Sequence, residues 1–236
     1  MRDLQPILKH LFNPRWQRWV RFDIAGVENL PKTGPVILAG NHRSYFDFFV
    51  LAQLVRLGGR PIRMMAKREI FDAPVIGALC HGMGGIPVDR ASAKATEAYA
   101  AAIVALEAGE VVGMMPQGTI PRGEAFFDPV LKGKTGVARI ARVTGAPVVP
   151  FGLWGTDVLW PRSAKGPKVS RWRDPVTVRV RIGPPVDLGP TPHAAHDTQR
   201  IMAAIMDLLP PEARVRRAPT EAEVRSAHPN GDLPSA

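Results

Sequence analysis

The chain has 236 residues, 45% of them hydrophobic and 22% charged, and a formal net charge of +10. This composition is ordinary for a globular protein, and the length suits one α/β domain with a large core. A single cysteine, Cys80, excludes an internal disulfide and a zinc site built from several cysteines, and its apolar surroundings predict a packed side chain rather than a nucleophile.

Residues 1–21 have the pattern of a basic amphipathic helix. Leu4, Ile7, Leu8 and Leu11 follow the spacing of one helical face, and tryptophans among arginines come next. Such a segment suits a helix lying in the interface of an anionic membrane, and it equally suits a first helix docked on the domain. No apolar run approaches the 18 residues of a membrane span, and the secretory-signal pattern is missing.

Residues 22–209 alternate short apolar runs with helical patterns. This alternation predicts a mostly parallel central sheet flanked by helices on both faces. The valine–arginine alternation in residues 176–186 predicts a half-exposed strand at a sheet edge. Strands are predicted in residues 35–40, 61–66, 84–90, 110–115, 146–155 and 176–186, and helices in 41–59, 72–83, 92–109, 133–145 and 194–209.

The last segment, residues 210–236, contains almost no large apolar residues. A stretch of this composition cannot bury enough surface to offset the entropy of ordering, so it predicts a disordered tail. The chain is therefore expected to consist of a membrane-surface segment (1–21), one domain (22–209) and a tail (210–236).

Polar residues cluster directly after three predicted strands. "NHRSYFD" follows "VILAG", "KRE" follows "RMMA", and "PQGTIPRG" follows "VVGMM". Ligands of open α/β sheets bind beyond the carboxyl ends of the strands. The sequence therefore predicts that one rim of the sheet gathers His42, Asp47, Lys67, Arg90 and the loop of residues 116–123.

His42 and Asp47 lie five residues apart, and on a continuous helix they would point about 140° away from each other. However, Ser44 and Asp47 have the spacing of a capping box, which places His42 in the turn before a helix. From the first turn the Asp47 carboxylate can reach back to one imidazole nitrogen and leave the other as a base. The alternative is that Asp47 only caps the helix and His42 is an ordinary loop histidine, which the spacing alone favours.

Four blocks of sequence make the chain resemble the 1-acylglycerol-3-phosphate acyltransferases, a family of glycerolipid acyltransferases. The blocks are "HRSYFD" (His42–Asp47), "GGIPVDR" (Gly84–Arg90), "MPQGTIP" (Met115–Pro121) and "VVPFG" (Val148–Gly152). They occur in the family's order within residues 22–155. In the third block the family usually carries a glutamate and an arginine where this chain has Gln117 and Ile120. These two departures leave the identity of the acceptor open.

The resemblance implies transfer of a fatty acyl group from acyl-CoA or acyl carrier protein to a lysophospholipid hydroxyl, giving phosphatidic acid when the acceptor is 1-acylglycerol 3-phosphate. It implies His42 as the general base and Asp47 as the acid that orients it, with no further cofactor and no metal. The family's arginine is replaced by Ile120 here, and Arg122 is a candidate to supply the missing positive charge. The residues expected to bind substrate are Lys67, Arg90, Gln117, Gly118, Thr119, Arg122 and Lys134.

The partners expected from this resemblance and from the charge are an acyl donor, a lysophospholipid and an anionic membrane. The basic N-terminus and residues 165–173 are expected to face headgroups at the cytoplasmic face of the cell membrane, as a peripheral protein. Two alternatives remain: an acyltransferase for glycerol 3-phosphate or another lysolipid, and a non-catalytic basic binding module. The sequence lacks the G-x-S-x-G elbow of serine hydrolases and any recognisable nucleic-acid-binding motif, so no nucleic acid is expected.

Overall fold

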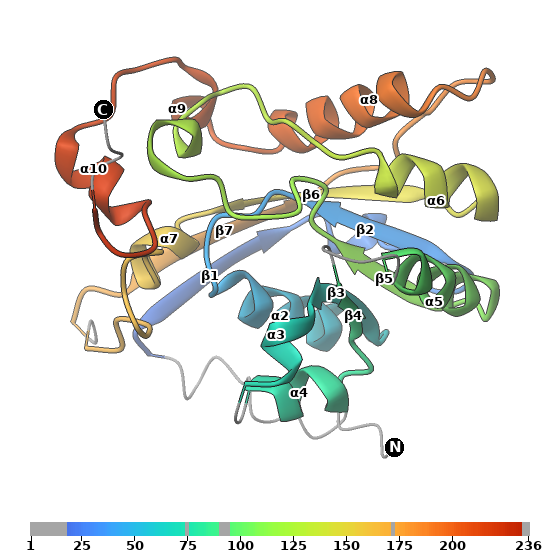
Figure 1. The fold of residues 1–236 in the computed structure, drawn as a ribbon, viewed down its shortest axis with the longest axis horizontal. Coiled ribbons are helices and arrows are strands. Elements are labelled where there is room, and N and C mark those ends of the chain that lie inside the picture. The colour runs from blue at the N-terminus through green and yellow to red at the C-terminus, as the bar shows by residue number, and fades with distance from the viewer. Residues whose placement is uncertain (1–17, 74–75, 90–94, 171–172, 233–236) are drawn as a thin grey trace.

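The computed structural model describes residues 18–73, 76–89, 95–170 and 173–232 (Figure 1). The predicted amphipathic segment 1–21 lies outside these residues except for its last four. Within them, seven strands form one sheet in the order β1-β7-β6-β2-β5-β3-β4. The strands are β1 (Val20–Ala25), β2 (Val36–Gly40), β3 (Ile62–Lys67), β4 (Ile86–Val88), β5 (Val111–Met114), β6 (Val148–Trp154) and β7 (Val176–Ile182).

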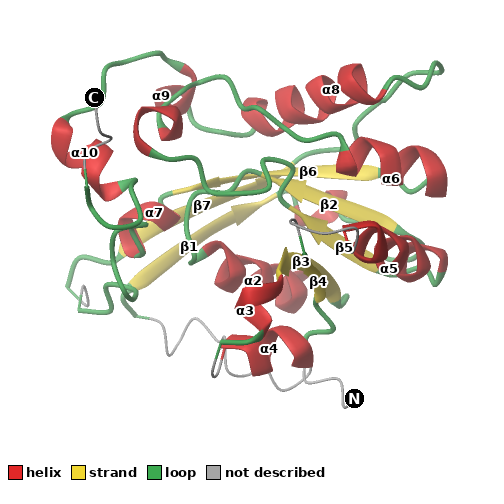
Figure 2. Cartoon of the chain, in the orientation of Figure 1, coloured by secondary structure: helices red, strands yellow, loops and turns green. Residues whose placement is uncertain are grey.

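Helices lie on both faces of this sheet, as the sequence predicts (Figure 2). All strand pairs are parallel except β6 with β7, which are antiparallel. The longer helices are α2 (Asp47–Gly58), α5 (Ala95–Glu107), α6 (Gly136–Thr144) and α8 (Ala194–Asp207), and the shorter ones are α3 (Arg68–Phe71), α4 (Ile76–Gly82), α7 (Thr156–Leu159), α9 (Pro211–Arg214) and α10 (Glu221–Ser226), with 3-10 turns at Val27–Asn29 and Gly123–Phe126.

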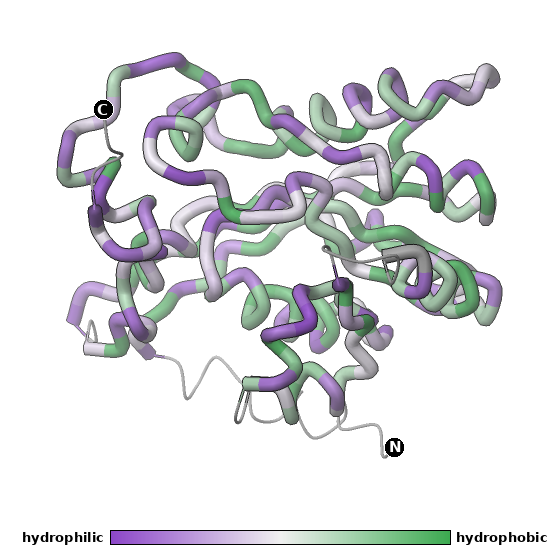
Figure 3. The backbone as a smooth tube through the Cα atoms, in the orientation of Figure 1, coloured by the Kyte–Doolittle hydropathy of each residue, from purple (hydrophilic) through white to green (hydrophobic). Residues whose placement is uncertain are grey.

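The central strand β2 separates two hydrophobic cores. Leu38 points to one face and packs with the apolar side of α2, whereas Ile37 points to the other face and packs with α5, α6 and α8. Every residue of β2 and β5 is buried, because helices cover both faces at this point. The outer helix α8 instead alternates polar and apolar residues along its length (Figure 3). The carboxyl end of β2 is thus held rigidly in the middle of the sheet.

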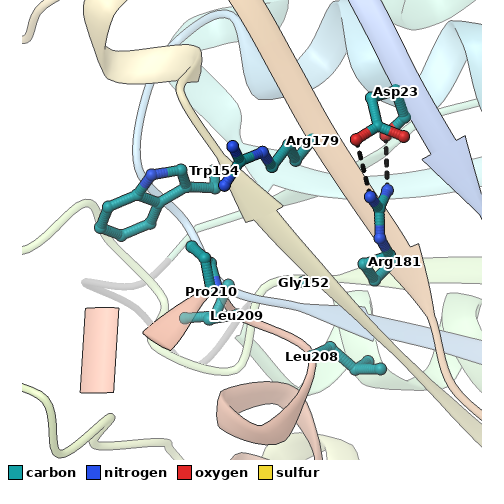
Figure 4. A pocket seen from close by; sticks show the side chains of 8 residues that line it. All are labelled: Asp23, Gly152, Trp154, Arg179, Arg181, Leu208, Leu209 and Pro210. Carbon is teal, nitrogen blue, oxygen red and sulfur yellow. Dashed lines mark hydrogen bonds and ion pairs between the residues drawn. The ribbon is translucent and has the colours of Figure 1, made fainter. Parts of the chain in front are cut away.

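Strand β7 is half-exposed, as its alternation predicts, but the prediction that it lies at an edge is wrong. It pairs with β6 on one side and with β1 on the other, so β1 forms the edge. Val178 and Val180 are fully buried, and Arg179 between them is exposed. The alternation arises because one face of this end of the sheet stays open, where a pocket of ≈ 430 Å³ lies above β6 and β7 (Figure 4). β1 is absent from the strands predicted above, although its sequence VRFDIA alternates apolar and polar residues as a half-buried strand does.

The described part of the C-terminal segment, residues 210–232, is ordered and contains α9 and α10, so the prediction of disorder is wrong for these residues. Thr220 and Glu223 form a reciprocal capping box at the start of α10. Hydrogen bonds from Arg217 and the Thr220 backbone lower the pKa of Glu223 to about 2. Ala227 packs with Ile120 and Phe126 of the loop between β5 and α6. Few apolar residues are enough here, because they complete a patch on the domain instead of forming a core of their own.

Replacing Val224 with aspartate is expected to undock α10, because Val224 is buried in the docked helix and a carboxylate there would lose its hydration. Limited proteolysis should then cut residues 210–232 many times faster, while the melting temperature of the domain changes little. Ala222→Asp, on the exposed side of α10, is the matched control. Equal protection of the V224D and A222D variants would contradict this docking.

Candidate functional site

Asn41 anchors the turn that follows β2. Its Nδ2 donates to the backbone oxygen of Leu153 at 2.9 Å, and its Oδ1 accepts from the Leu153 backbone nitrogen at 2.7 Å. Both contacts reach the neighbouring strand β6, and the Asn41 side chain is buried. The amide of Asn41 supplies both the donor and the acceptor that pair with the Leu153 backbone, as a neighbouring strand would. The first residue of the turn is therefore fixed to β6.

The next residue, His42, meets Asp47 as the sequence predicts. His42 Nδ1 lies 2.7 Å from Asp47 Oδ2, and the same oxygen accepts the backbone N–H groups of Arg43 at 2.7 Å and Ser44 at 3.0 Å. The Asp47 side chain is 1% exposed and that of His42 is 27% exposed. Because a carboxylate only accepts, we assign the Nδ1 proton to this contact, which leaves Nε2 as the acceptor nitrogen of a partly exposed ring.

Helix α2 begins at Asp47, two residues later than a Ser44 cap would place it. Phe46 is the N-cap, and no side chain caps the helix there. Ser44 organises the preceding turn instead: its Oγ accepts from the Phe46 backbone nitrogen at 3.0 Å and donates to the Trp160 backbone oxygen at 2.7 Å. Asp47 still reaches back to the Ser44 backbone, which is half of a capping box. The capping prediction was therefore wrong in detail, although the expected contact with His42 is present.

Gln117 holds the other side of His42. The His42 backbone nitrogen donates to Gln117 Oε1 at 2.7 Å. Glutamate would offer the same acceptor with a negative charge, so glutamine keeps the contact and removes the charge. Gln117 comes from the loop that follows β5, so this bond ties that loop to the turn after β2.

The same loop brings Gly118 and Lys134 together. Gly118 has a φ of 73°, and a Cβ on it would lie 3.3 Å from Lys134 Cδ, so the lysine chain crosses over the glycine. The Gly118 backbone N–H donates to the Met115 oxygen at 2.8 Å, so this donor is already paired within the loop. Thr119 is exposed, and its Oγ1 lies 3.4 Å from the neighbouring Ile120 oxygen.

The predicted cations fall in different places. Lys67 is exposed and pairs with Glu69 at 2.6 Å, an ion pair at the surface. Arg122 is exposed on the loop after β5, and Lys134 is exposed beside Gly118. Arg90 lies outside the described residues. The structure thus brings Lys134 and Arg122 to the loop that contacts His42 and leaves Lys67 paired near the end of β3.

Arg43 is a residue of this site that the sequence did not single out. Its guanidinium lies between the rings of Phe126 and Trp154, 4.2 Å from each centroid, and its Nε donates to Asp157 at 3.0 Å. Cation–π contacts on both faces fix the side chain next to His42. The three partners lie 83 to 114 positions further along the chain, so no local pattern could have revealed them.

Cys80 is 3% exposed, and burial raises the pKa of its thiol to about 11. We expect Ellman's reagent at mildly alkaline pH to label the folded protein roughly 100-fold more slowly than the denatured protein, because the thiolate is the reacting form. Rapid stoichiometric labelling of the folded chain would contradict this.

Among the described residues, no three His, Cys, Asp or Glu side chains gather as metal ligands would. Within that same part of the chain, no helix combines the length and apolar character needed to cross a bilayer.

Comparisons with known proteins agree with the predicted resemblance. The family model described as Acyltransferase matches residues 21–154. The chain is 32% identical over 146 residues to the chloroplastic 1-acyl-sn-glycerol-3-phosphate acyltransferase BAT2 of Brassica napus, covering 61% of this chain and 40% of the relative. It is 29% identical over 145 residues to a Borreliella burgdorferi protein named 1-acyl-sn-glycerol-3-phosphate acyltransferase, covering 60% and 54%.

An uncharacterized protein of Mycobacterium tuberculosis is 27% identical over 201 residues, covering 80% of this chain and 52% of the relative. The chain thus spans about half the length of the curated relatives it matches. Among solved structures, the acyltransferase PlsC of Thermotoga maritima superposes with a TM-score of 0.60 at 24% identity, covering 87% of this chain and 78% of that one. This likeness shows the fold.

Proposed function

Because the chain belongs to the acyltransferase family, we propose that it moves a fatty acyl group from a thioester to the hydroxyl of 1-acylglycerol 3-phosphate, giving phosphatidic acid. The observation that carries the proposal is the His42–Asp47 pair: a partly exposed imidazole held by a buried carboxylate at 2.7 Å. Further support comes from the relatives in Brassica napus and Borreliella burgdorferi, both of which are named 1-acyl-sn-glycerol-3-phosphate acyltransferases.

In the proposed reaction, His42 Nε2 removes the proton of the acceptor hydroxyl as its oxygen attacks the thioester carbonyl. The tetrahedral intermediate then collapses, the C–S bond breaks, and the proton passes from His42 to the departing thiolate. Asp47 holds the ring by Nδ1 and stabilises the imidazolium formed in between. A thiol of pKa roughly 8.5 is a good leaving group, so the reaction needs no covalent intermediate on the protein.

The reaction is tested by thiol release. Purified protein is mixed with acyl-CoA, with or without 1-acylglycerol 3-phosphate, and products are read by lipid mass spectrometry. Thiol release that requires the lysolipid and yields phosphatidic acid is the expected result. Release without acceptor indicates a hydrolase, and the absence of release with both acyl-CoA and acyl carrier protein donors indicates a non-catalytic module.

A second acceptor is the main alternative, and the departures at Gln117 and Ile120 favour testing it. Glycerol 3-phosphate and other lysolipids retain a hydroxyl that His42 would deprotonate in the same way. Running the thiol assay across these acceptors at equal concentration ranks them by kcat/KM. Preference for one of them would keep the acyl-transfer mechanism and replace the proposed product.

We also propose that the protein binds the cytoplasmic face of the cell membrane peripherally. Support comes from the net charge of +10 and from exposed Lys165, Lys168 and Arg173 in the basic segment 165–173. Each Lys or Arg near an anionic surface contributes on the order of 1 kcal/mol. In flotation at low salt, full-length protein should rise with vesicles rich in phosphatidylglycerol and stay behind with phosphatidylcholine vesicles. Equal behaviour with both would count against the proposal.

A further inference from the structure

Residues 160–163 are fixed between the turn of His42 and the C-terminal helix α10. The Trp160 backbone oxygen accepts the Ser44 hydroxyl at 2.7 Å, and the Trp160 ring meets Tyr45 edge-on at 5.7 Å. On the other side, the Ser163 backbone nitrogen donates to the Ser226 oxygen at 3.3 Å. This segment therefore has a set position next to the first block of the site.

From that segment, Arg162 reaches the loop of the third block. Its Nη1 donates to the backbone oxygen of Ile120, and its Nε is buried with no hydrogen-bond partner. Ile120 stands three residues after Gln117, which contacts the His42 backbone. A buried guanidinium nitrogen without an acceptor is costly, so the hydrogen-bonding capacity of Arg162 is not met by the described residues.

Arg122 lies on the loop of the third block, two residues after Ile120, whose backbone oxygen Arg162 contacts. Burial lowers the pKa of Arg162, the like charge of Arg122 adds to that effect, and Tyr45 partly offsets it. Across the described residues, neither arginine has a carboxylate within ion-pair distance. Guanidinium groups that have no carboxylate partner favour the binding of an anion, and a phosphate fits their planar donors.

The arginines that line the pocket above β6 and β7 lack this property. In the pocket of Figure 4, Arg181 points to Asp23 and is bonded to it at 2.7 Å, and Arg179 pairs with Glu212 at 3.3 Å. Those charges are already compensated within the chain. Arg162 and Arg122, in contrast, have no carboxylate partner among the described residues, and they respectively contact and belong to the loop whose Gln117 bonds to the His42 backbone.

We propose that Arg162, together with Arg122, binds the phosphate monoester of the acyl acceptor and so determines acceptor choice; this inference rests on the proposed function. This proposal accounts for the presence of Ile120 where the third block of the family usually has an arginine. Ile120 is 2% exposed and packs against Phe126 and Ala227, so its side chain faces the C-terminal segment instead of the substrate. The cation comes from a different segment, which reaches the same loop through the Ile120 carbonyl.

The test compares Arg162→Gln and Arg122→Gln with Arg225→Gln, an exposed arginine of α10 that pairs with Glu221. Acceptors are 1-acylglycerol 3-phosphate and 1-monoacylglycerol, which has the same acyl chain and acceptor hydroxyl but a second hydroxyl in place of the phosphate. Loss of a charged hydrogen bond predicts a KM for the phosphate-bearing acceptor that rises roughly 10- to 100-fold in R162Q. The KM for monoacylglycerol, the KM for acyl-CoA and the kcat should stay close to those of the wild type, and Arg162→Lys should recover part of the loss.

Three results would overturn the assignment. They are an unchanged KM for 1-acylglycerol 3-phosphate, a rise in the KM for acyl-CoA instead, and an equal loss of kcat with both acceptors, which would indicate that Arg162 only supports the loop. Calorimetric titration with glycerol 3-phosphate, with glycerol as reference, reads the same site without turnover. Wild-type binding that R162Q loses supports the site even if no acyl transfer is found, so the two proposals fail separately.

Discussion

Replacing His42 with alanine is expected to lower kcat for acyl transfer by roughly 10²- to 10⁴-fold, the usual contribution of a positioned general base. The backbone contact to Gln117 Oε1 does not depend on the side chain, so the loop after β5 should stay in place. Because the ring is 27% exposed and does not belong to either core, the melting temperature should change little. The measurement is thiol release under saturating substrates, combined with thermal unfolding.

His196→Ala serves as the matched control for this variant, since His196 is exposed at the start of α8, away from the turn that follows β2. It should retain wild-type kcat. Activity of the H42A protein within tenfold of wild type would show that another group removes the proton, and the proposed mechanism would then be abandoned.

Replacing Asp47 with asparagine is expected to reduce kcat on a similar scale, roughly 10²- to 10⁴-fold, because the imidazolium formed during the reaction loses its counter-charge. The asparagine oxygen can still accept from the Arg43 and Ser44 backbone nitrogens, so the turn should survive. Hydrogen bonds to a charged acceptor are worth about 1.5–3 kcal/mol, so the free energy of unfolding should fall by an amount of that order. Thiol release and urea unfolding measure the two effects.

Asp157→Asn is the control that separates these effects, because Asp157 pairs with Arg43 in the same neighbourhood but does not contact His42. Its kcat should stay within a few-fold of wild type. If D47N lowers stability while kcat remains at the wild-type level, Asp47 serves only to hold the turn, and the alternative interpretation of the H-x-x-x-x-D spacing is correct.

The C-terminal segment packs against the loop that contains the third block. Isoleucine at position 120 would be poorly placed on an exposed catalytic loop, yet it is buried because Ala227 and Phe126 cover it. Arg217 stacks over the neighbouring Phe127 at 5.1 Å and pairs with Glu223 at 2.7 Å. The loop that contacts His42 is therefore supported by residues that lie 90 to 107 positions later in the chain.

Local signals were enough for most of the fold. Strand β2 is a continuous apolar run because both of its faces are buried, and helix α2 has an apolar stripe because one of its sides is buried. Hydrophobic periodicity therefore located both elements. The ordered blocks around His42 and Asp47 indicated the family, and the 2.7 Å contact agrees with the pairing expected from them. These features depend on residues close together in sequence, which is why the sequence by itself determined them.

Only the tertiary structure decided the features that depend on distant partners. β7 is an inner strand because β1, more than 150 residues earlier, pairs with it, and Asn41 is anchored by a strand 112 residues away. The same holds for the stacking of Arg43, the order of α10 and the placement of Arg162 over Ile120. In each case the stabilising contact joins residues that come close together only when the chain folds. A pattern of neighbouring residues in the sequence therefore cannot predict it.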